Sequence, residues 1–313
     1  MATMTAERQA VDAPTPAPAT RATSRVTRRP LTGMLFVAPT AVIVAALFVV
    51  PLAVLVYMSF ADWPLIGSPT PNGLENYRKI ADDELFLGAI TFTLVYTAIT
   101  TVVVFGVSFV LVWISNSPRR GSTFYRTAFF LPYVVGTAAA ALMWYIDLND
   151  QIGVFNQILQ AVGITDGPAG FLDTPAKATF SVVAMVVWKF IGFQVVVLLV
   201  GLQSIPTELY EAARVDGAST WHRLRYITIP YLRPTLALLL MLSITGSLLA
   251  FDQFMVLTRG GPDNATVTLV YAVYNAAFSS FELGSAAALS MVLLLALVVL
   301  NIVQLRLLRK RES

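Results

Sequence analysis

The sequence contains no cysteine and one histidine. Without cysteine the chain has no disulfide, no thiol nucleophile and no cysteine ligand for a metal. A single histidine, His222, excludes most histidine-based catalysis and metal chemistry. We therefore expect a protein that is not an enzyme, with no catalytic residue, no metal site and no cofactor bound by this chain.

Charged residues are also scarce. They make up 12% of the 313 residues, while 57% are hydrophobic and the mean hydropathy is +0.71. Soluble domains carry roughly 25% charged residues. A deficit of this size excludes a soluble globular protein and indicates that lipid surrounds most of the chain, with no nucleic acid as partner.

Six apolar segments are each near or above the roughly 20 residues that cross the hydrocarbon core. None shows the alternation of a membrane β-strand. The sequence therefore predicts an all-α, polytopic membrane protein with six transmembrane helices, the third of which is interrupted by Pro132 and Gly136. The predicted spans are Gly33–Phe60, Leu87–Ile114, Thr123–Ile146, Ala178–Gln203, Thr235–Leu257 and Gly284–Leu305.

Three regions follow from this pattern. Residues 1–32 are rich in Ala, Pro and Thr and are predicted to be a disordered cytoplasmic tail. The apolar run after them is longer than the h-region of a signal peptide, so it is predicted to be a retained span. Residues 33–306 form the transmembrane domain, and residues 307–313 form a basic cytoplasmic tail.

Positive charge is distributed unevenly between the two sides. Five Arg precede the first span, three lie between the second and third or in the first turn of the third, four lie between the fourth and fifth, and four Lys or Arg lie at the end of or after the sixth. The opposite side carries only four Lys or Arg. Cytoplasmic loops hold the excess of Lys and Arg, so both termini are predicted to be cytoplasmic.

The interval 204–234, between the fourth and fifth spans, is polar and patterned. Pro206 suits the first turn of a helix, and Gly217 suits the left-handed position that ends it. Ser219 is predicted to cap a second short helix, which Pro230 should stop. On these grounds alone, a docking surface and an interfacial hairpin without a partner are equally good interpretations.

The residues of this loop resemble the EAA loop of permease subunits of bacterial ABC importers. Glu211-Ala212-Ala213 is followed after three residues by Gly217, and after nine more by Ile227-Thr228-Ile229-Pro230. Ile229 stands where the family has Leu. Other stretches resemble the carbohydrate-type permeases that import maltose, glycerol-3-phosphate or oligosaccharides: Asn72-Gly73-Leu74-Glu75-Asn76-Tyr77, Phe251-Asp252-Gln253 and Leu257-Thr258-Arg259-Gly260-Gly261-Pro262.

The resemblance implies a type I ABC importer permease in a bacterial inner membrane. Its implied partners are a second homologous permease, an ABC ATPase dimer that binds the ATP, and an extracytoplasmic binding protein that delivers a sugar. The residues implied to contact the ATPase are Glu211, Ala212, Ala213, Asp216, Gly217, Ile227 and Pro230.

Two charged residues, Lys189 and Asp252, fall inside the predicted fourth and fifth spans. A charge within the membrane is costly and marks a candidate functional site. The two side chains are expected to form a structural ion pair, to line a wet cavity, or to extend to the outer interface of the membrane.

Trp188 and Phe193 lie near the same height, and the resemblance places them at sugar-binding positions. Gln194 and Gln253 offer hydrogen bonds to hydroxyl groups. Helix packing remains the alternative for Trp188, and bonds between helices remain the alternative for the two glutamines. The predicted substrate path is Trp188, Lys189, Phe193, Gln194, Asp252 and Gln253.

Three alternatives stay open. The alternative solute for a permease of this type is glycerol-3-phosphate or a polyol in place of a sugar. A secondary transporter would show inverted repeats, and the sequence contains no convincing internal repeat. A membrane enzyme would need a clustered acid–base or metal set, which the scattered acids do not supply.

Overall fold

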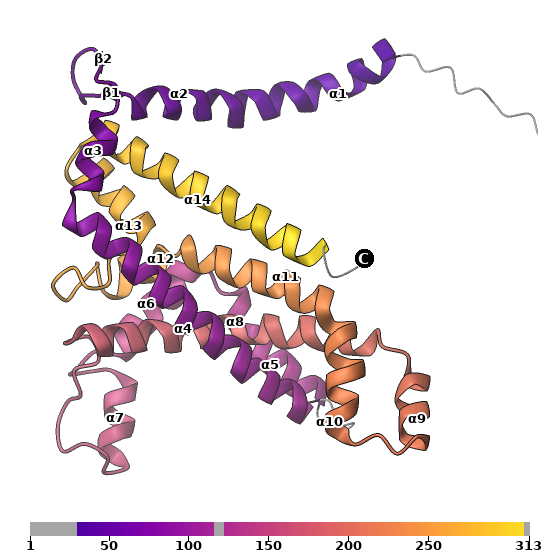
Figure 1. Cartoon of the computed structure of the whole chain (residues 1–313). Helices are drawn as coiled ribbons and strands as arrows, with labels where there is room; N and C mark the ends of the chain where they lie inside the picture. Colours follow the sequence, from indigo (N-terminus) through magenta and orange to yellow (C-terminus); the bar gives the residue numbers. More distant parts are fainter. Residues whose placement is uncertain (1–29, 116–121, 310–313) are drawn as a thin grey trace, which may run out of the picture. The chain divides into compact units, whose positions relative to one another are not determined.

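The computed structural model of the chain describes residues 30–115 and 122–309, which are mostly helical (Figure 1). Two short strands pair antiparallel, with Ala61 opposite Pro71 and Asp62 opposite Thr70. The predicted all-α fold is therefore confirmed.

The elements follow in a simple order along the chain. They are α1 (Pro30–Val44), a π-helical turn (Ala45–Val49), α2 (Val50–Ser59), β1 (Ala61–Asp62), β2 (Thr70–Pro71), α3 (Glu75–Ala81), α4 (Glu84–Ser115), α5 (Ser122–Val134), α6 (Thr137–Asp147), α7 (Val154–Ala161), α8 (Pro175–Gln203), α9 (Thr207–Val215), α10 (Thr220–Arg223), a π-helical turn (Leu224–Thr228), α11 (Ile229–Leu248), α12 (Asp252–Leu257), α13 (Leu269–Tyr274), a π-helical turn (Asn275–Ser279) and α14 (Leu283–Arg309).

The chain divides into two compact units between Pro51 and Leu52. The first is described from Pro30 onward and is one apolar helical stretch that continues through Pro39. The predicted N-terminal tail lies outside the described residues up to position 29, and residues 30–32 already belong to α1. The second unit contains the remaining elements and the sites discussed below.

The described chain contains six apolar spans when one bent pair of helices is counted as a single span. Five helices are long and apolar enough to cross a membrane: Met34–Ser59, Glu84–Trp113, Pro175–Gln203, Thr220–Leu248 and Leu283–Arg306. The sixth is a broken pair, Thr127–Val134 and Thr137–Asp147, bent by 104°. The break lies at Val135 and Gly136, just beyond Pro132, which remains inside α5, so the third predicted span is interrupted near the expected residues.

The fifth span differs from its prediction at both ends. It begins at Thr220, because the helix continues through Pro230 instead of stopping there. Tyr226, whose carbonyl a regular helix would press against the Pro230 ring, lies in the π-helical turn Leu224–Thr228, which widens the helix at that point. The span ends at Leu248, nine residues before the predicted Leu257, so Asp252 lies beyond it, as the first residue of α12.

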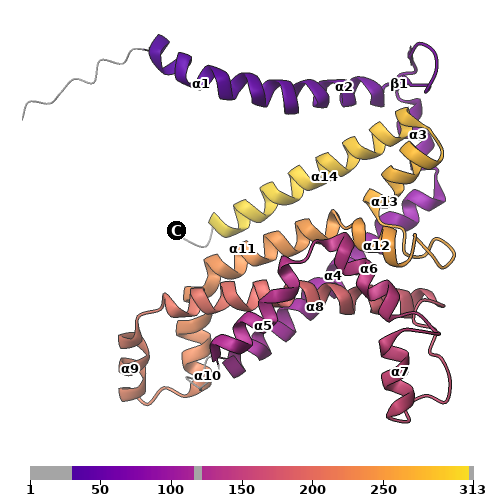
Figure 2. The same ribbon diagram turned by 180° about the vertical axis from the view of Figure 1, so that it is seen from behind.

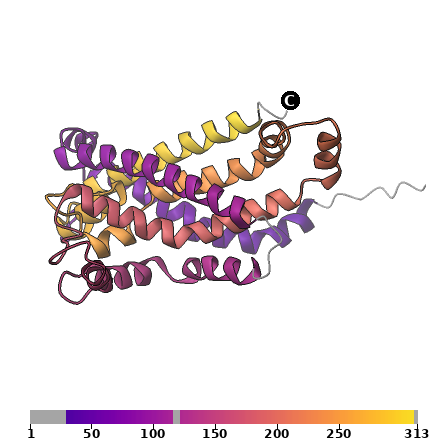
Figure 3. The same cartoon turned by 90° about the horizontal axis from the view of Figure 1, so that it is seen from below.

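Helix α8 is the centre of the second unit and packs against α4, α5 and α11 (Figures 2 and 3). Its buried side chains include Val182, Met185 and Leu198. Gly192 lies directly against the backbone of α5, where a Cβ atom would be 1.8 Å from the carbonyl oxygen of Phe129. This close approach brings the broken span against α8 at the level of the cavity described next.

Candidate functional site

The loop between α8 and α11 is a helical hairpin, at the end of α8 opposite α7 (Figure 1). Gly217 has a φ of +74°, and the N–H of Ala218 donates to the carbonyl of Ala213 at 2.9 Å, which closes the end of α9. The Ser219 side chain accepts the N–H of His222 at 3.3 Å and caps α10. The predicted helix, tight turn and second helix are confirmed up to Pro230.

Helix α9 has no buried residue. The Tyr210 hydroxyl lies 2.9 Å from Oγ1 of Thr228, which ties α9 to the π-helical turn that leads into α11. A displacement of α9 would therefore be passed to α11. Of the predicted coupling residues, Glu211, Ala212, Asp216 and Gly217 are exposed, and Ala213, Ile227 and Pro230 are half-buried.

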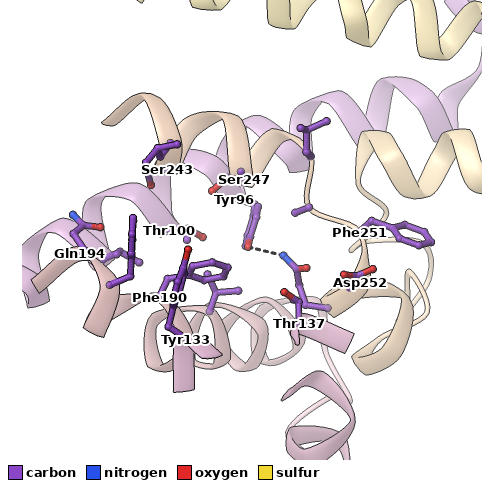
Figure 4. A pocket seen from close by; sticks show the side chains of 18 of the residues that line it. Tyr96, Thr100, Tyr133, Thr137, Phe190, Gln194, Ser243, Ser247, Phe251 and Asp252 are labelled. Carbon is purple, nitrogen blue, oxygen red and sulfur yellow. Dashed lines mark hydrogen bonds between the residues drawn. The ribbon is translucent and has the colours of Figure 1, made fainter. Parts of the chain in front are cut away.

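A cavity of about 390 Å³ lies between α4, α5, α6, α8, α11 and α12 (Figure 4). Gln194 and Ser243 lie at one end, and Phe251 and Asp252 at the other. Most of its lining is apolar or aromatic. The polar lining side chains are Tyr96, Thr100, Tyr133, Thr137, Gln194, Ser243, Ser247, Asp252 and Gln253.

Aromatic rings and polar atoms meet on the cavity wall. The Tyr133 and Phe193 rings are stacked, with centroids 4.7 Å apart and planes 15° apart. The Gln253 amide donates to the Tyr96 hydroxyl at 3.3 Å (Figure 4). The amide nitrogen of Gln194 is buried and has no hydrogen-bond partner among the described residues. Such a wall offers ring faces and hydrogen bonds to a bound molecule.

Four of the predicted path residues line this cavity: Phe193, Gln194, Asp252 and Gln253. Trp188 and Lys189 do not. Trp188 packs against Trp144, with ring centroids 5.9 Å apart, as its packing alternative expected.

The ion pair considered for Lys189 and Asp252 is not present. Lys189 is 3% exposed, and its ammonium group donates to the backbone carbonyls of Tyr133 and Val135. Asp252 is exposed at the start of α12, because the fifth span ends before it. Within the described part of the chain, the recorded salt bridge joins Arg78 and Glu75 instead.

Several lining residues were missed in the sequence. Tyr96 and Thr100 are one turn apart on α4, as are Ser243 and Ser247 on α11. Polar residues four apart in an apolar helix share one face, so this spacing is a signal that could have found them. Which helices those faces meet depends on packing across the whole bundle, which spacing alone does not give.

The Asn72–Tyr77 stretch, which carries part of the resemblance, is structural. The Asn76 amide donates to the carbonyls of Ser59 at 3.1 Å and Ala61 at 2.9 Å. The Tyr77 hydroxyl donates to Oγ of Ser59 at 2.9 Å. These bonds satisfy backbone groups where α2 ends and β1 begins.

The chain is similar in sequence to permease proteins of other transport systems. The chain is 31% identical over 278 residues to the "Probable starch degradation products transport system permease protein AmyD" of Thermoanaerobacterium thermosulfurigenes, covering 89% of this chain and 94% of that protein. It is 35% identical over 281 residues to the sn-glycerol-3-phosphate transport system permease protein UgpA of Agrobacterium fabrum, covering 88% and 94%.

The fold matches a bacterial ABC transporter that imports the acidic polysaccharide alginate. One crystal structure aligns with a TM-score of 0.78 at 24% identity over 90% of this chain and 95% of the other. A second, in complex with an alginate pentasaccharide-bound periplasmic protein, aligns with a TM-score of 0.75 over 88% and 92%. Residues 112–313 match the family described as the binding-protein-dependent transport system inner membrane component. The chain therefore belongs to this family and is a multi-pass permease subunit of an ABC importer.

Proposed function

We propose that the cavity of this permease is part of the translocation path for a neutral sugar delivered by an extracytoplasmic binding protein. The observation that carries the proposal is the composition of the cavity wall. Stacked aromatic rings suit the apolar faces of a pyranose, and the amides and hydroxyls suit its hydroxyl groups. The path residues in contact with the sugar are Phe193, Gln194 and Gln253, joined by Tyr96 and Tyr133.

The charge of the wall favours a neutral solute over glycerol-3-phosphate, the solute named for the Agrobacterium relative. Asp252 is the one Asp or Glu among the lining residues that the structure describes, and no Lys or Arg lines the cavity there. Arg and Lys supply the full positive charge that pairs with a phosphate group in proteins. A phosphate monoester beside Asp252 would meet like charge instead.

The exposed face of α9 is the contact with the ATPase. The residues proposed to make it are Glu211, Ala212, Ala213, Asp216 and Gly217, with Ile227 and Pro230 shaping the base of the hairpin. Because Tyr210 ties α9 to Thr228, closure of an ATPase dimer moves the N-terminal end of α11. The same helix lines the cavity through Ser243 and Ser247. A second homologous permease completes the pore.

This assignment puts the α9 hairpin in the cytoplasm and α7 on the outer side. The Lys and Arg distribution supports that orientation, because the side of the hairpin holds sixteen of them and the opposite side four. Both chain ends are then cytoplasmic, in a bacterial inner membrane.

The solute is identified by screening the partner binding protein. Its thermal unfolding is followed with neutral mono- and oligosaccharides, polyols and glycerol-3-phosphate. The solute that raises its melting temperature is then tested for stimulation of ATP hydrolysis by the complete importer in nanodiscs. A neutral carbohydrate as the stimulating solute supports the proposal. Stimulation by glycerol-3-phosphate alone contradicts it.

A further inference from the structure

The bend between α5 and α6 leaves backbone carbonyls without helical partners. The last carbonyls of any helix lack an N–H from a following turn, so donors from elsewhere must satisfy them. Here α5 ends at Val134 and α6 begins at Thr137 after a bend of 104°. The carbonyls at the bend therefore have room for a donor supplied by another element.

Lys189 of α8 is that donor. Its side chain is buried, and its ammonium group donates to the carbonyls of Val135 and Tyr133. The nitrogen also lies 5.3 Å from the centre of the Phe190 ring and 5.9 Å from that of Tyr133. A cation is favourable at the C-terminal end of a helix, where the carbonyls carry partial negative charge.

A second contact holds the same two helices together one turn away. Gly192 packs so closely on the backbone of Phe129 that any side chain there would clash. Lys189 and Gly192 are three residues apart on one face of α8, so both contacts act on α5. The position and direction of α5 at the bend are thus set by α8.

The bend matters because its two arms supply two walls of the cavity. Tyr133 comes from α5 just before the bend, and Thr137 opens α6 just after it. Tyr133 is stacked on Phe193 of α8. Lys189 does not line the cavity itself, so any effect it has on the solute passes through these residues.

We propose that Lys189 is a positioning residue, which holds the broken third span in its bent form by binding the carbonyls exposed at the bend. Its consequence for transport rests on the proposed function of the cavity. This role replaces both an ion pair with Asp252 and direct contact with solute. The charge of Lys189 is satisfied by carbonyl oxygens and aromatic rings within the part of the chain that the structure describes.

The absence of native cysteine allows the bend to be measured directly. Cysteines at exposed positions on the two arms, Ala128→Cys and Met143→Cys, carry nitroxide labels in the complete importer in nanodiscs. Electron–electron double resonance then measures the distance between the two labels in the absence of solute and ATP. At 1.5 Å per residue, straightening it would lengthen the separation by roughly 8 Å.

The expected result is a single short distance between the labels in the chain that keeps Lys189. The same distance is expected with Lys189→Arg, which keeps a charged donor. Lys189→Met, of similar length but without a donor, should add a longer component or broaden the distribution roughly twofold. Lys177→Met, an exposed lysine in the first turns of the same helix, is the matched control and should leave the distance unchanged.

An unchanged distribution in Lys189→Met overturns the proposal. If that variant fails to assemble, Lys189→Leu, which is shorter and also has no donor, takes its place with the same criterion. Solute uptake measured on the same variants separates the two proposals. A bend that opens without any change in uptake supports the role of Lys189 and contradicts the cavity as the path.

Discussion

At the scale of single residues, the cavity offers a few polar atoms among aromatic rings. Gln194 is the clearest of them, because its buried amide nitrogen has no hydrogen-bond partner within the described residues. A buried polar group without a partner costs about 1–3 kcal/mol, which a sugar hydroxyl would recover on binding. Gln194 is therefore the first residue to substitute in the cavity.

We predict that Gln194→Leu weakens solute binding by about tenfold, equivalent to about 1.4 kcal/mol. The leucine removes the donor with little change of volume. Isothermal titration of the solute into the complex in nanodiscs measures the effect. Gln157→Leu, an exposed glutamine on α7, is the control and should bind as the unsubstituted chain does; equal affinities in the two variants would contradict the role of Gln194.

Asp252 is the one carboxylate on the described lining of the cavity. Two like charges about 4 Å apart repel by about 4 kcal/mol at an effective dielectric constant of 20. We therefore predict that Asp252→Asn raises affinity for an acidic sugar by at least roughly tenfold and changes affinity for the matching neutral sugar by less than about threefold. The same titration, with the neutral and acidic sugar pair, measures both. Equal changes for the two sugars would show that the carboxylate does not face the solute.

Sequence reasoning at this scale succeeded for residues whose neighbours are local and failed where packing decides. Gln194 and Gln253 were found because a polar residue in an apolar span is conspicuous. Lys189 was found for the same reason, but its partners are backbone carbonyls of the broken third span, more than 50 positions earlier. No periodicity predicts that contact.

At the scale of elements, the turn between α9 and α10 depends on one backbone conformation. Gly217 has a φ of +74°, whereas proline is fixed near −65°. Asparagine tolerates positive φ. We predict that Gly217→Pro abolishes uptake while the protein still inserts and assembles, and that Gly217→Asn retains most of it. Uptake into proteoliposomes, normalised to permease content, distinguishes them, and normal uptake with Gly217→Pro would exclude a coupling role for the turn.

The link between α9 and α11 rests on the Tyr210 and Thr228 hydroxyls. A neutral hydrogen bond contributes about 1 kcal/mol, so Tyr210→Phe should lower coupling by about fivefold. The measurement is the ratio of solute transported to ATP hydrolysed. Tyr226→Phe, an exposed tyrosine of the same hairpin, should leave the ratio unchanged. A normal ratio in both variants would mean that α9 acts on the membrane helices by another contact.

The ends of elements show where local rules apply. Caps at Ser219 and Gly217 were predictable because their bonding partners lie within a few residues. The continuation of the helix through Pro230 was not, since it requires a π-helical turn that widens the preceding residues. The early end at Leu248 likewise follows from a break among apolar residues that hydropathy alone does not reveal.

At the scale of the whole molecule, six spans and the uneven distribution of Lys and Arg predict which loops face which side. Val215 in α9 and Ile158 in α7 are both exposed, so each can be replaced by a single cysteine for labelling. We predict that an impermeant maleimide added to right-side-out vesicles labels Ile158→Cys and leaves Val215→Cys unlabelled until the membrane is broken. The reverse pattern would invert the topology and remove α9 from the ATPase.

The lengths of the apolar segments were sufficient to predict the number of spans, because the thickness of the bilayer sets the length of a span. The distribution of Lys and Arg was sufficient to predict an orientation. The cavity was not predictable as a whole, since four separate stretches of sequence contribute to it. Its position follows from how α4, α8 and α11 pack around the broken span. The family motifs indicated function, and the structure supplied the residues that line the cavity.

The most direct test of the account is solute uptake into proteoliposomes. The vesicles contain this permease with its partner permease and ATPase, with ATP inside and loaded binding protein outside. We predict uptake that requires ATP, the binding protein and both permeases, and that is lost with Gly217→Pro. Transport of the solute by this chain alone, in vesicles without ATP, would contradict the account.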